Sequence, residues 1–328
     1  MIEYSKDIIL NSNLSLRRNI KGFDFPTTMT YEDSEKIVEM IREIYPGEVI
    51  LLSEIDENTK SKLINDMVLS EDIDSKLAQI AVVMKDDYII TVNDRDHLAI
   101  NIRAFDMNIN KAYKRAYQIE AELDEKLDFA FSVEYGYLTS DARNAGAGIE
   151  ARLKMFLFGL VTPEESYWGF RQGLMTHGMY GERYIPKYYD KYVDDIYLVK
   201  NFGNYRADMD EYIASMGVNI DSLVRNERRF RRDYQILNNI SDEDIIEEIA
   251  ISLNNLNAGT LKSLNTIANE LYRLKKYNAL GFNTDLTSNE LDYLIFNLSK
   301  NKFKGKKDPE RIEFLNSYMK ERQWKLTD

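Results

Sequence analysis

The sequence predicts an α+β fold, with a mostly antiparallel sheet flanked by helices and a small all-α domain after it. Three observations support this fold class. Apolar runs at 79–84 and 88–92 flank the turn Asp86-Asp87, as in a β-hairpin. The longer segment 109–127 repeats its apolar residues at helical spacing. From about residue 240 onward the apolar residues follow helical spacing throughout.

The first part of the chain alternates between strand and helix signals. Residues 7–24 read as an extended stretch with a turn before Pro26. Thr30 with Asp33 has the spacing of a helix N-cap, and Pro46-Gly47 predicts the end of that helix. The remaining elements predicted here are strands at 49–53, 79–84, 88–92, 98–103, 129–133, 172–180 and 196–199, and helices at 109–127 and 207–235.

A change in character near Asn238-Asn239 predicts a domain boundary. We therefore expect an α+β domain over 1–236 and a helical domain over 240–328. Capping signals mark the starts of four helices in the second domain, namely Ser241 with Asp244, Thr260, Thr287 with Glu290, and Asp308-Pro309.

Composition excludes several kinds of protein. The chain has 328 residues, with 43 Lys and Arg against 55 Asp and Glu, so its net charge is −12. Such an acidic chain is a poor general binder of nucleic acid. It has no Cys and two His, which excludes disulfides, thiolate catalysis and a multi-His metal site. Without an apolar run long enough to span a bilayer, we expect a cytoplasmic protein that binds neither membrane nor nucleic acid.

Several motifs in order resemble the ATP:guanido phosphotransferase (phosphagen kinase) family, and among its members the bacterial protein-arginine kinases. TVNDRDHLAI at 91–100 is similar to the family's N-E-E-D-H-L-R. DEKLDFAFSVEYGYLTSDARNAGAGIEA at 124–151 is similar to E-E-K-L-D-Y-A-F, G-Y-L-T and C-P-T-N-V-G-T-G-L-R-A-S. Residues 7–22 and 176–182 are similar to the opening S-S-R-[IV]-R pattern and to V-R-G-L-Y-G-E. The resemblance covers about 7–235, and the helical tail fits the extra domain of protein-arginine kinases.

The resemblance implies a guanidino-kinase fold and transfer of phosphoryl from ATP-Mg to an arginine guanidinium. Such transfer depends on arginines that neutralise the phosphates and on carboxylates that hold and deprotonate the guanidinium. This chain has lost the phosphate-binding arginines of every motif that aligns. The residues in their places are Asn13, Ser15, Ala99, Glu150 and His177.

The carboxylate positions are altered as well. Arg95 replaces the acid that the family uses as base, Asp94 keeps a carboxylate, Ile185 replaces a later acid, and Asp141 replaces the Cys beside the guanidine site. The residues that shape the loops remain, namely Asn93, Asp96, His97, Asn144, Gly146, Gly148, Gly181 and Glu182. For His97 we favour a loop-ordering role over a catalytic one.

We therefore expect a pseudokinase with no cofactor and no metal site. The resemblance implies a homodimer or a heterodimer with an active protein-arginine kinase, and a Clp unfoldase or an activator protein as a further partner in protein quality control. Two alternatives stay open: an active kinase that uses Arg17 or Arg143 as substitutes, and a cation-binding protein. The latter would use an acidic cleft, with carboxylates at Asp94, Asp96, Asp141, Glu150 and Glu182. We also expect Arg95 to pair with Glu150 or Asp141.

Overall fold

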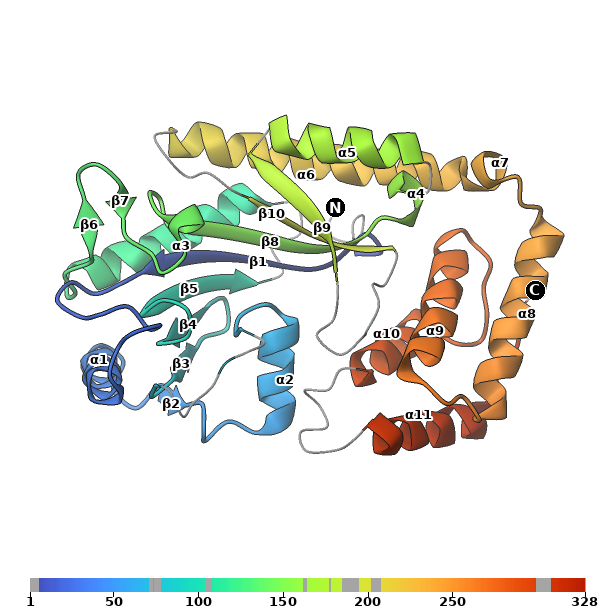
Figure 1. Cartoon of the computed structure of the whole chain (residues 1–328), viewed down its shortest axis with the longest axis horizontal. Coiled ribbons are helices and arrows are strands. Elements are labelled where there is room, and N and C mark those ends of the chain that lie inside the picture. Colours follow the sequence, from blue (N-terminus) through green and yellow to red (C-terminus); the bar gives the residue numbers. More distant parts are fainter. Residues whose placement is uncertain are drawn as a thin grey trace. The chain divides into compact units, whose positions relative to one another are not determined.

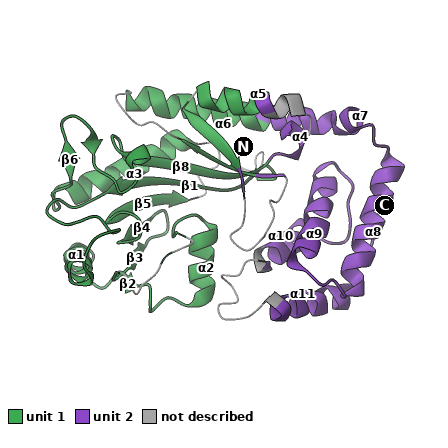
Figure 2. Cartoon of the chain, viewed as in Figure 1, with its two compact units in different colours: residues 1–156, 169–182, 197–224 green, residues 157–168, 183–196, 225–328 purple. Residues whose placement is uncertain are grey.

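A computed structural model describes most of residues 6–327 and divides them into two compact units, coloured separately in Figure 2. The described residues exclude 71–72, 74–77, 104–107, 162–163, 177, 185–194, 202–207 and 299–307. Unit 1 comprises 1–156, 169–182 and 197–224, and unit 2 comprises 157–168, 183–196 and 225–328. Two of the boundaries fall inside helices, between Trp168 and Gly169 and between Val224 and Arg225. Separate folding of 1–236 and 240–328 stays a prediction.

Unit 1 is built on an eight-stranded sheet with the order β2-β3-β4-β5-β1-β8-β10-β9 (Figure 1). Near its middle, β1 (Ile9–Arg18) pairs antiparallel with β5 (Leu98–Arg103) on one side and β8 (Ile149–Phe156) on the other. The other strands are β2 (Val49–Leu51), β3 (Ala81–Met84), β4 (Ile89–Val92), β9 (Met179–Arg183) and β10 (Ile196–Asn201), with a separate hairpin of β6 (Phe131–Ser132) and β7 (Gly136–Tyr137). The predicted α+β class with a mostly antiparallel sheet is confirmed.

Strand β1 is buried on both of its faces. Leu14 and Leu16 point to one face, and Asn13, Ser15 and Arg17 alternate with them on the other. Helix α3 (Ile109–Asp124) packs against β1 and β5 and buries an apolar stripe of its own. A polar strand face inside the molecule must find hydrogen-bond partners, and this requirement shapes the site described below.

The helices begin where capping residues allow. At α1 (Tyr31–Ile44), the Thr30 side chain accepts from the Asp33 backbone N–H, which confirms the predicted start. The sequence prediction omitted α2 (Glu57–Asn65). It was wrong over 172–176, which ends helix α5 (Glu164–Thr176), because so short an apolar run fits helix or strand equally well. The chain continues through α4 (Phe158–Val161), the 3-10 turn at Ala142–Asn144, α6 (Met209–Arg232) and α7 (Tyr234–Asn238).

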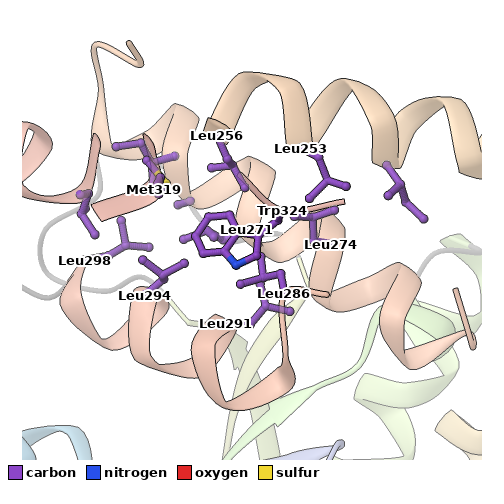
Figure 3. Close-up of a cluster of buried hydrophobic side chains, with 14 of the residues drawn as sticks. Leu253, Leu256, Leu271, Leu274, Leu286, Leu291, Leu294, Leu298, Met319 and Trp324 are labelled. Atoms are coloured by element: carbon purple, nitrogen blue, oxygen red, sulfur yellow. The ribbon is translucent and has the colours of Figure 1, made fainter. Parts of the chain in front are cut away.

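Unit 2 contains the helical C-terminal region. Its helices are α8 (Asp242–Ala258), α9 (Leu264–Ala279), α10 (Ser288–Asn297) and α11 (Asp308–Arg322). They enclose a leucine-rich core around Trp324 and Leu271 (Figure 3). The predicted capping boxes at Ser241 and Thr287 are confirmed, whereas the start predicted at Thr260 is wrong because Ser263 caps α9. Among the helices described in the two units, none has the length and apolar character needed to cross a bilayer.

Candidate functional site

The candidate site is the face of the sheet on which β1, β5 and β8 carry polar side chains; we call it the polar face. Strand register brings its residues together, because residues opposite each other in an antiparallel pair point to the same side. Ser15 lies opposite Asn101 on β5 and Glu150 on β8, and Arg17 lies opposite Ala99. The polar face consists of Asn13, Ser15, Arg17, Ala99, Asn101, Glu150 and Arg152. Four positions at which the family motifs have phosphate-binding arginines therefore lie side by side. Three of them are on β1 and β8, and the fourth is on β5.

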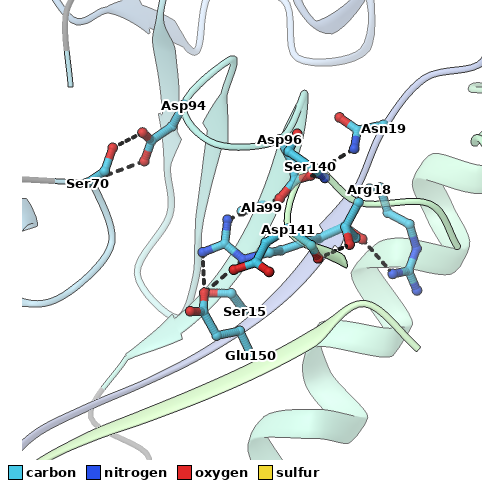
Figure 4. A network of polar contacts seen from close by, with 12 residues as sticks. Ser15, Arg18, Asn19, Ser70, Asp94, Asp96, Ala99, Ser140, Asp141 and Glu150 are labelled. Carbon is cyan, nitrogen blue, oxygen red and sulfur yellow. Dashed lines mark hydrogen bonds and ion pairs between the residues drawn. The ribbon is translucent and has the colours of Figure 1, made fainter. Parts of the chain in front are cut away.

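At the centre of the polar face, Arg17 and Glu150 form a buried ion pair. Figure 4 shows Glu150 in the surrounding network of polar contacts. The Arg17 Nε atom donates to Glu150 Oε2 at 2.8 Å, and its Nη2 atom donates to the same oxygen. The Nη1 atom reaches Asp96 Oδ2 at 3.3 Å. Arg152 lies on the other side of Glu150, with Nε 3.7 Å from Oε2. The carboxylate therefore sits between two arginines of the chain itself.

The electrostatics of this group follow from burial and pairing. Burial alone would raise the pKa of Glu150, but Arg152 and Arg17 outweigh it and hold that pKa well below its ordinary range. Burial alone would lower the pKa of Arg17, and the carboxylates of Glu150 and Asp96 outweigh it and raise that pKa. Burial lowers the pKa of Arg152 to about 10, since Glu150 offsets only part of its effect. All three groups are charged at neutral pH.

The polar face is closed by the residues that follow α2. Asn13 donates to the Met67 carbonyl at 2.8 Å, and Arg152 donates to the same carbonyl. Met67 has the unusual backbone angle φ of 58°, which aims this carbonyl at the face. Asn13 and Ser15 also bond to the Asn101 amide oxygen, at 3.0 and 2.7 Å. Asn13 and Ser15 are 0% exposed, so the face offers these groups no contact with solvent.

Asp96 and His97 order the loop between β4 and β5. Asp96 accepts from the Asn19 side chain at 2.8 Å and from the Ser140 backbone at 2.7 Å. The Ile20 N–H donates to His97 Nδ1, so Nε2 carries the proton and donates to the Asp24 carbonyl, both at 2.9 Å. Burial lowers the pKa of His97, which keeps the ring neutral. The loop-ordering hydrogen bonds expected of His97 are present.

Other retained motif residues hold the backbone around this loop. Asn93 has φ 59° and donates to the Ser34 and Gln79 carbonyls at 2.9 Å. Asn144 is buried at the end of a 3-10 turn, and Gly146 and Gly148 have positive φ. A Cβ atom at Gly148 would lie 2.6 Å from the Arg17 carbonyl oxygen. Gly181 lies on β9 against Phe170, and the adjacent Glu182 pairs with Lys200.

The expected ion pair of Arg95 with Glu150 or Asp141 is not present among the described residues, although the charge of Arg95 helps to lower the pKa of Glu150. The Arg95 side chain is exposed, and no ion pair among the described residues joins it to Glu150, whose partners are Arg17 and Arg152. Asp141 instead pairs with Arg143, at the surface. Arg95 lies in the loop between β4 and β5, whereas Arg17 lies on β1 and bonds directly to Glu150.

The alternative of a metal-binding acidic cleft is not supported by the described residues. Asp94 accepts from the Ser70 backbone at 2.9 Å, while Asp96 and Glu150 are both bonded to Arg17. Each carboxylate has its own donor, so within the described ranges no group of three or more His, Asp or Glu could hold a metal ion. His177 and Ile185, the other two altered positions, lie outside the described residues.

Sequence reasoning missed three participants: the pairing role of Arg17, and the contributions of Arg152 and Asn101. Each lies two residues from a position that was identified, on the same strand face. The period of two along a strand was the available signal. It could not be used without the register between β1, β5 and β8.

The family described as ATP:guanido phosphotransferase, C-terminal catalytic domain, matches residues 29–229. The protein-arginine kinase of Caldanaerobacter subterraneus subsp. tengcongensis is 28% identical over 259 residues, covering 74% of this chain and 75% of the relative. That of Clostridium tetani is 25% identical over 293 residues, covering 86% and 82%.

Solved structures of phosphagen kinases share the fold. The duplicated taurocyamine kinase of Schistosoma mansoni, solved with transition-state analogue components, matches with a TM-score of 0.57 and 19% identity. That match covers 71% of this chain and 34% of the duplicated protein. A lombricine kinase matches with a TM-score of 0.53 and 15% identity, covering 74% and 73%. At these identities the structural likeness concerns the fold alone.

Proposed function

Because the chain belongs to the ATP:guanido phosphotransferase family, we propose that it is a pseudokinase of the protein-arginine kinase type. It would keep the family fold without transferring phosphoryl from ATP to arginine. The observation that carries this proposal is the buried carboxylate of Glu150, at a position where the family motif has an arginine. A carboxylate there repels a triphosphate instead of neutralising it.

The surroundings of Glu150 support the same conclusion. Asn13, Ser15 and Ala99 replace three further arginines of the family motifs, and all three are buried. Removing a single donor to transition-state charge typically costs about 3 kcal/mol of barrier stabilisation. The loss of several such donors at one face leaves the family mechanism without its electrostatic stabilisation.

The two candidate substitutes for the missing arginines, Arg17 and Arg143, are already bonded to carboxylates of the chain. Arg17 is 4% exposed and bonded to both Glu150 and Asp96, so it would have to break two charge-assisted bonds to reach a phosphate. Arg143 lies at the surface, paired with Asp141. These contacts favour a pseudokinase over an active kinase with replacement arginines.

We propose further that the protein acts by binding within arginine-phosphorylation and protein quality control. Its partner would be a second copy, an active protein-arginine kinase, a Clp unfoldase or an activator protein. The family resemblance over most of the chain supports this choice of partners.

The proposal is tested by incubating the chain with ATP-Mg and casein and measuring phosphoarginine by phosphorus NMR. The kinase of Caldanaerobacter subterraneus subsp. tengcongensis serves as the positive control. We expect phosphoarginine with the relative and none with this chain. A melting curve with and without ATP-Mg runs in parallel, because a ligand that binds only the native state raises Tm.

We expect the Tm of this chain to be unchanged by ATP-Mg. Phosphoarginine formed by this chain but not by its Asp96→Ala variant would overturn the proposal. A clear rise of Tm in ATP-Mg would show that the chain binds nucleotide, and would contradict the expectation that it binds no ATP.

A further inference from the structure

An open hollow of about 460 Å³ lies between α3 and the beginning of α6, both in unit 1. Its α3 wall carries hydrogen-bond donors, and its α6 wall carries carboxylates. The residues that matter here are Tyr113, Lys114, Tyr117, Gln118, Asp208 and Asp210. None of them belongs to the polar face, and the proposed function uses none of them.

Two tyrosine rings form the apolar part of the α3 wall. Tyr113 and Tyr117 are four residues apart, so they lie on the same face of α3. Their ring centroids are 6.1 Å apart, and the rings are tilted by 38° to each other. Tyr117 keeps 55% of its surface exposed, and Tyr113 is partly buried. The pair therefore offers a continuous strip of ring surface to a ligand.

The polar groups of the α3 wall are available as donors. Among the described residues, no hydrogen bond involves the hydroxyls of Tyr113 and Tyr117 or the Gln118 amide, and no ion pair involves Lys114. Burial raises the pKa of Tyr113, and the nearby Asp210 carboxylate adds to this effect, so the hydroxyl keeps its proton at neutral pH. The wall can therefore donate several hydrogen bonds to acceptors of a ligand.

The α6 wall is acidic. Asp208 accepts from the Glu211 backbone N–H at 3.0 Å through one carboxylate oxygen, which leaves the other oxygen for a further donor. Asp208 and Asp210 are both exposed. In the described part of the chain, neither of them forms an ion pair, although Lys114 lines the same hollow. This wall can therefore attract a cationic group of a ligand.

A polyproline II helix matches the α3 wall in length and in chemistry. It rises about 3.1 Å per residue, so two residues advance about 6.2 Å, close to the 6.1 Å between the ring centroids. With three residues per turn, such a helix touches a surface along two of its three ridges. Prolines two positions apart can therefore pack on the two rings. The carbonyl oxygens of this helix have no internal hydrogen bonds, and the α3 wall provides donors for them.

We propose that the hollow binds a proline-rich segment of another protein, in the polyproline II conformation and with a basic residue beside the prolines. Tyr113 and Tyr117 pack against the prolines, and Asp208 and Asp210 receive the basic residue. Grooves lined by aromatic residues bind such segments because the segment is largely ordered before it binds.

The partner is a different protein and not a second copy of this chain. A second copy has no proline-rich segment, because its five prolines are isolated from one another, at Pro26, Pro46, Pro163, Pro186 and Pro309. The inference does not depend on whether the chain transfers phosphoryl.

The test uses the full chain and a fluorescein-labelled, capped peptide of six prolines followed by one lysine. Two comparison peptides replace the prolines by alternating glycine and serine, or the lysine by glutamine. Fluorescence anisotropy at low ionic strength measures each Kd, with no nucleotide present. We expect the proline peptide to bind about tenfold more tightly than the glycine–serine peptide, which loses more conformational entropy on binding. Replacing the lysine should weaken binding about threefold, as for an exposed ion pair.

Variants locate the site. Tyr117→Ala should weaken the proline peptide about tenfold because it removes one of the two rings, whereas Tyr117→Phe removes only a donor and should cost about fivefold. Asp208→Asn with Asp210→Asn should abolish the preference for lysine over glutamine. The matched control is Tyr135→Ala, which removes a tyrosine of similar exposure, 49%, from the β6–β7 turn and should leave the Kd unchanged. Melting curves confirm that each variant is folded.

Equal affinity for the proline and glycine–serine peptides, or no measurable binding of either, would overturn the proposal. Wild-type affinity in Tyr117→Ala would do so as well, and so would an equal loss in Tyr135→Ala, since each would place the peptide elsewhere. Equal affinity for the lysine and glutamine peptides would exclude the role of Asp208 and Asp210. Because no ATP is used, these results are independent of the kinase assay.

Discussion

Glu150 carries a negative charge into a region that water barely reaches, with a side-chain exposure of 11%. A charge in such a place persists only with partners, and Arg17 and Arg152 provide them. The partners depend on Glu150 in turn, because both arginines are buried beside it. Removing one member of such a group leaves an uncompensated buried charge, which is the costly event.

We predict that Glu150→Gln lowers the free energy of unfolding by about 3 kcal/mol at neutral pH, as for other broken buried pairs. Because the pKa of Glu150 is depressed, its contribution to the free energy of unfolding depends on pH. The charge pair contributes its full stabilisation above the ordinary glutamate pKa of 4.5, and loses it progressively as pH falls from 4.5 toward the depressed pKa of Glu150 in the folded state. Urea unfolding across acidic pH should show the gap between wild type and variant closing.

Asp141→Asn is the matched control, because Asp141 also pairs with an arginine but is 42% exposed. Its cost should stay under about 1 kcal/mol, as for surface pairs. Equal and small effects of the two substitutions would show that the buried network contributes little to stability.

At the residue scale, the sequence revealed which charges had changed but not how they would pair. Glu150 stood out because it replaces an arginine in a recognisable motif. Its partner Arg17 is 133 positions away, and only strand register brings the two together. Arg95 was the more obvious candidate and proved exposed, since a loop residue's direction depends on backbone angles that a motif does not reveal.

At the scale of elements, β8 enters the sheet through Gly148, directly against the end of β1. The Gly148 backbone has φ 67°, and the Arg17 N–H donates to its carbonyl at 2.7 Å. Two strands can approach this closely because no side chain stands between them. The glycine thus sets the position of the strand that carries Glu150.

We predict that Gly148→Ala is more destabilising than Gly22→Ala. Both glycines have positive φ, so both substitutions incur roughly 1 kcal/mol of backbone strain. An added Cβ meets nothing within 4 Å at Gly22, whereas at Gly148 it collides with the Arg17 carbonyl oxygen at 2.6 Å. Overpacking adds about 1–3 kcal/mol. Equal shifts of Tm would show that the contact relaxes at no cost.

Elements with strong local signals were predictable, and the others were not. Thr30, Ser241 and Thr287 start helices because their hydroxyls satisfy backbone N–H groups within three residues. The end of α5 looked like a strand, since tertiary packing decides short apolar runs. The predicted start at Thr260 was three residues early because Ser263 provides the capping oxygen.

At the scale of the whole molecule, the helical region has a core of its own. Every buried apolar residue of the cluster around Trp324 lies between Ile245 and Trp324 (Figure 3). Among the described residues, no buried member of that cluster comes from outside this stretch, and the partly buried Ile240 packs against it. A region that completes its own core is expected to fold alone.

We predict that a fragment of residues 240–328 is helical and melts cooperatively. Leu271→Ala, which empties a fully buried position, should cost about 2–5 kcal/mol and abolish or sharply lower its transition. The control is Ile251→Ala, on a side chain that is 47% exposed. A broad, non-cooperative melt of the fragment by circular dichroism would show that the region needs the rest of the chain.

The buried network around Glu150 also bears on how this protein can evolve. Changing Glu150 alone to arginine would place three buried cations side by side, with Asp96 left as the ion-pair partner of Arg17. That intermediate is less stable than either endpoint, so the order of substitutions matters. The internal ion pair therefore makes a change of Glu150 to the arginine of the family motif unfavourable when it is made alone.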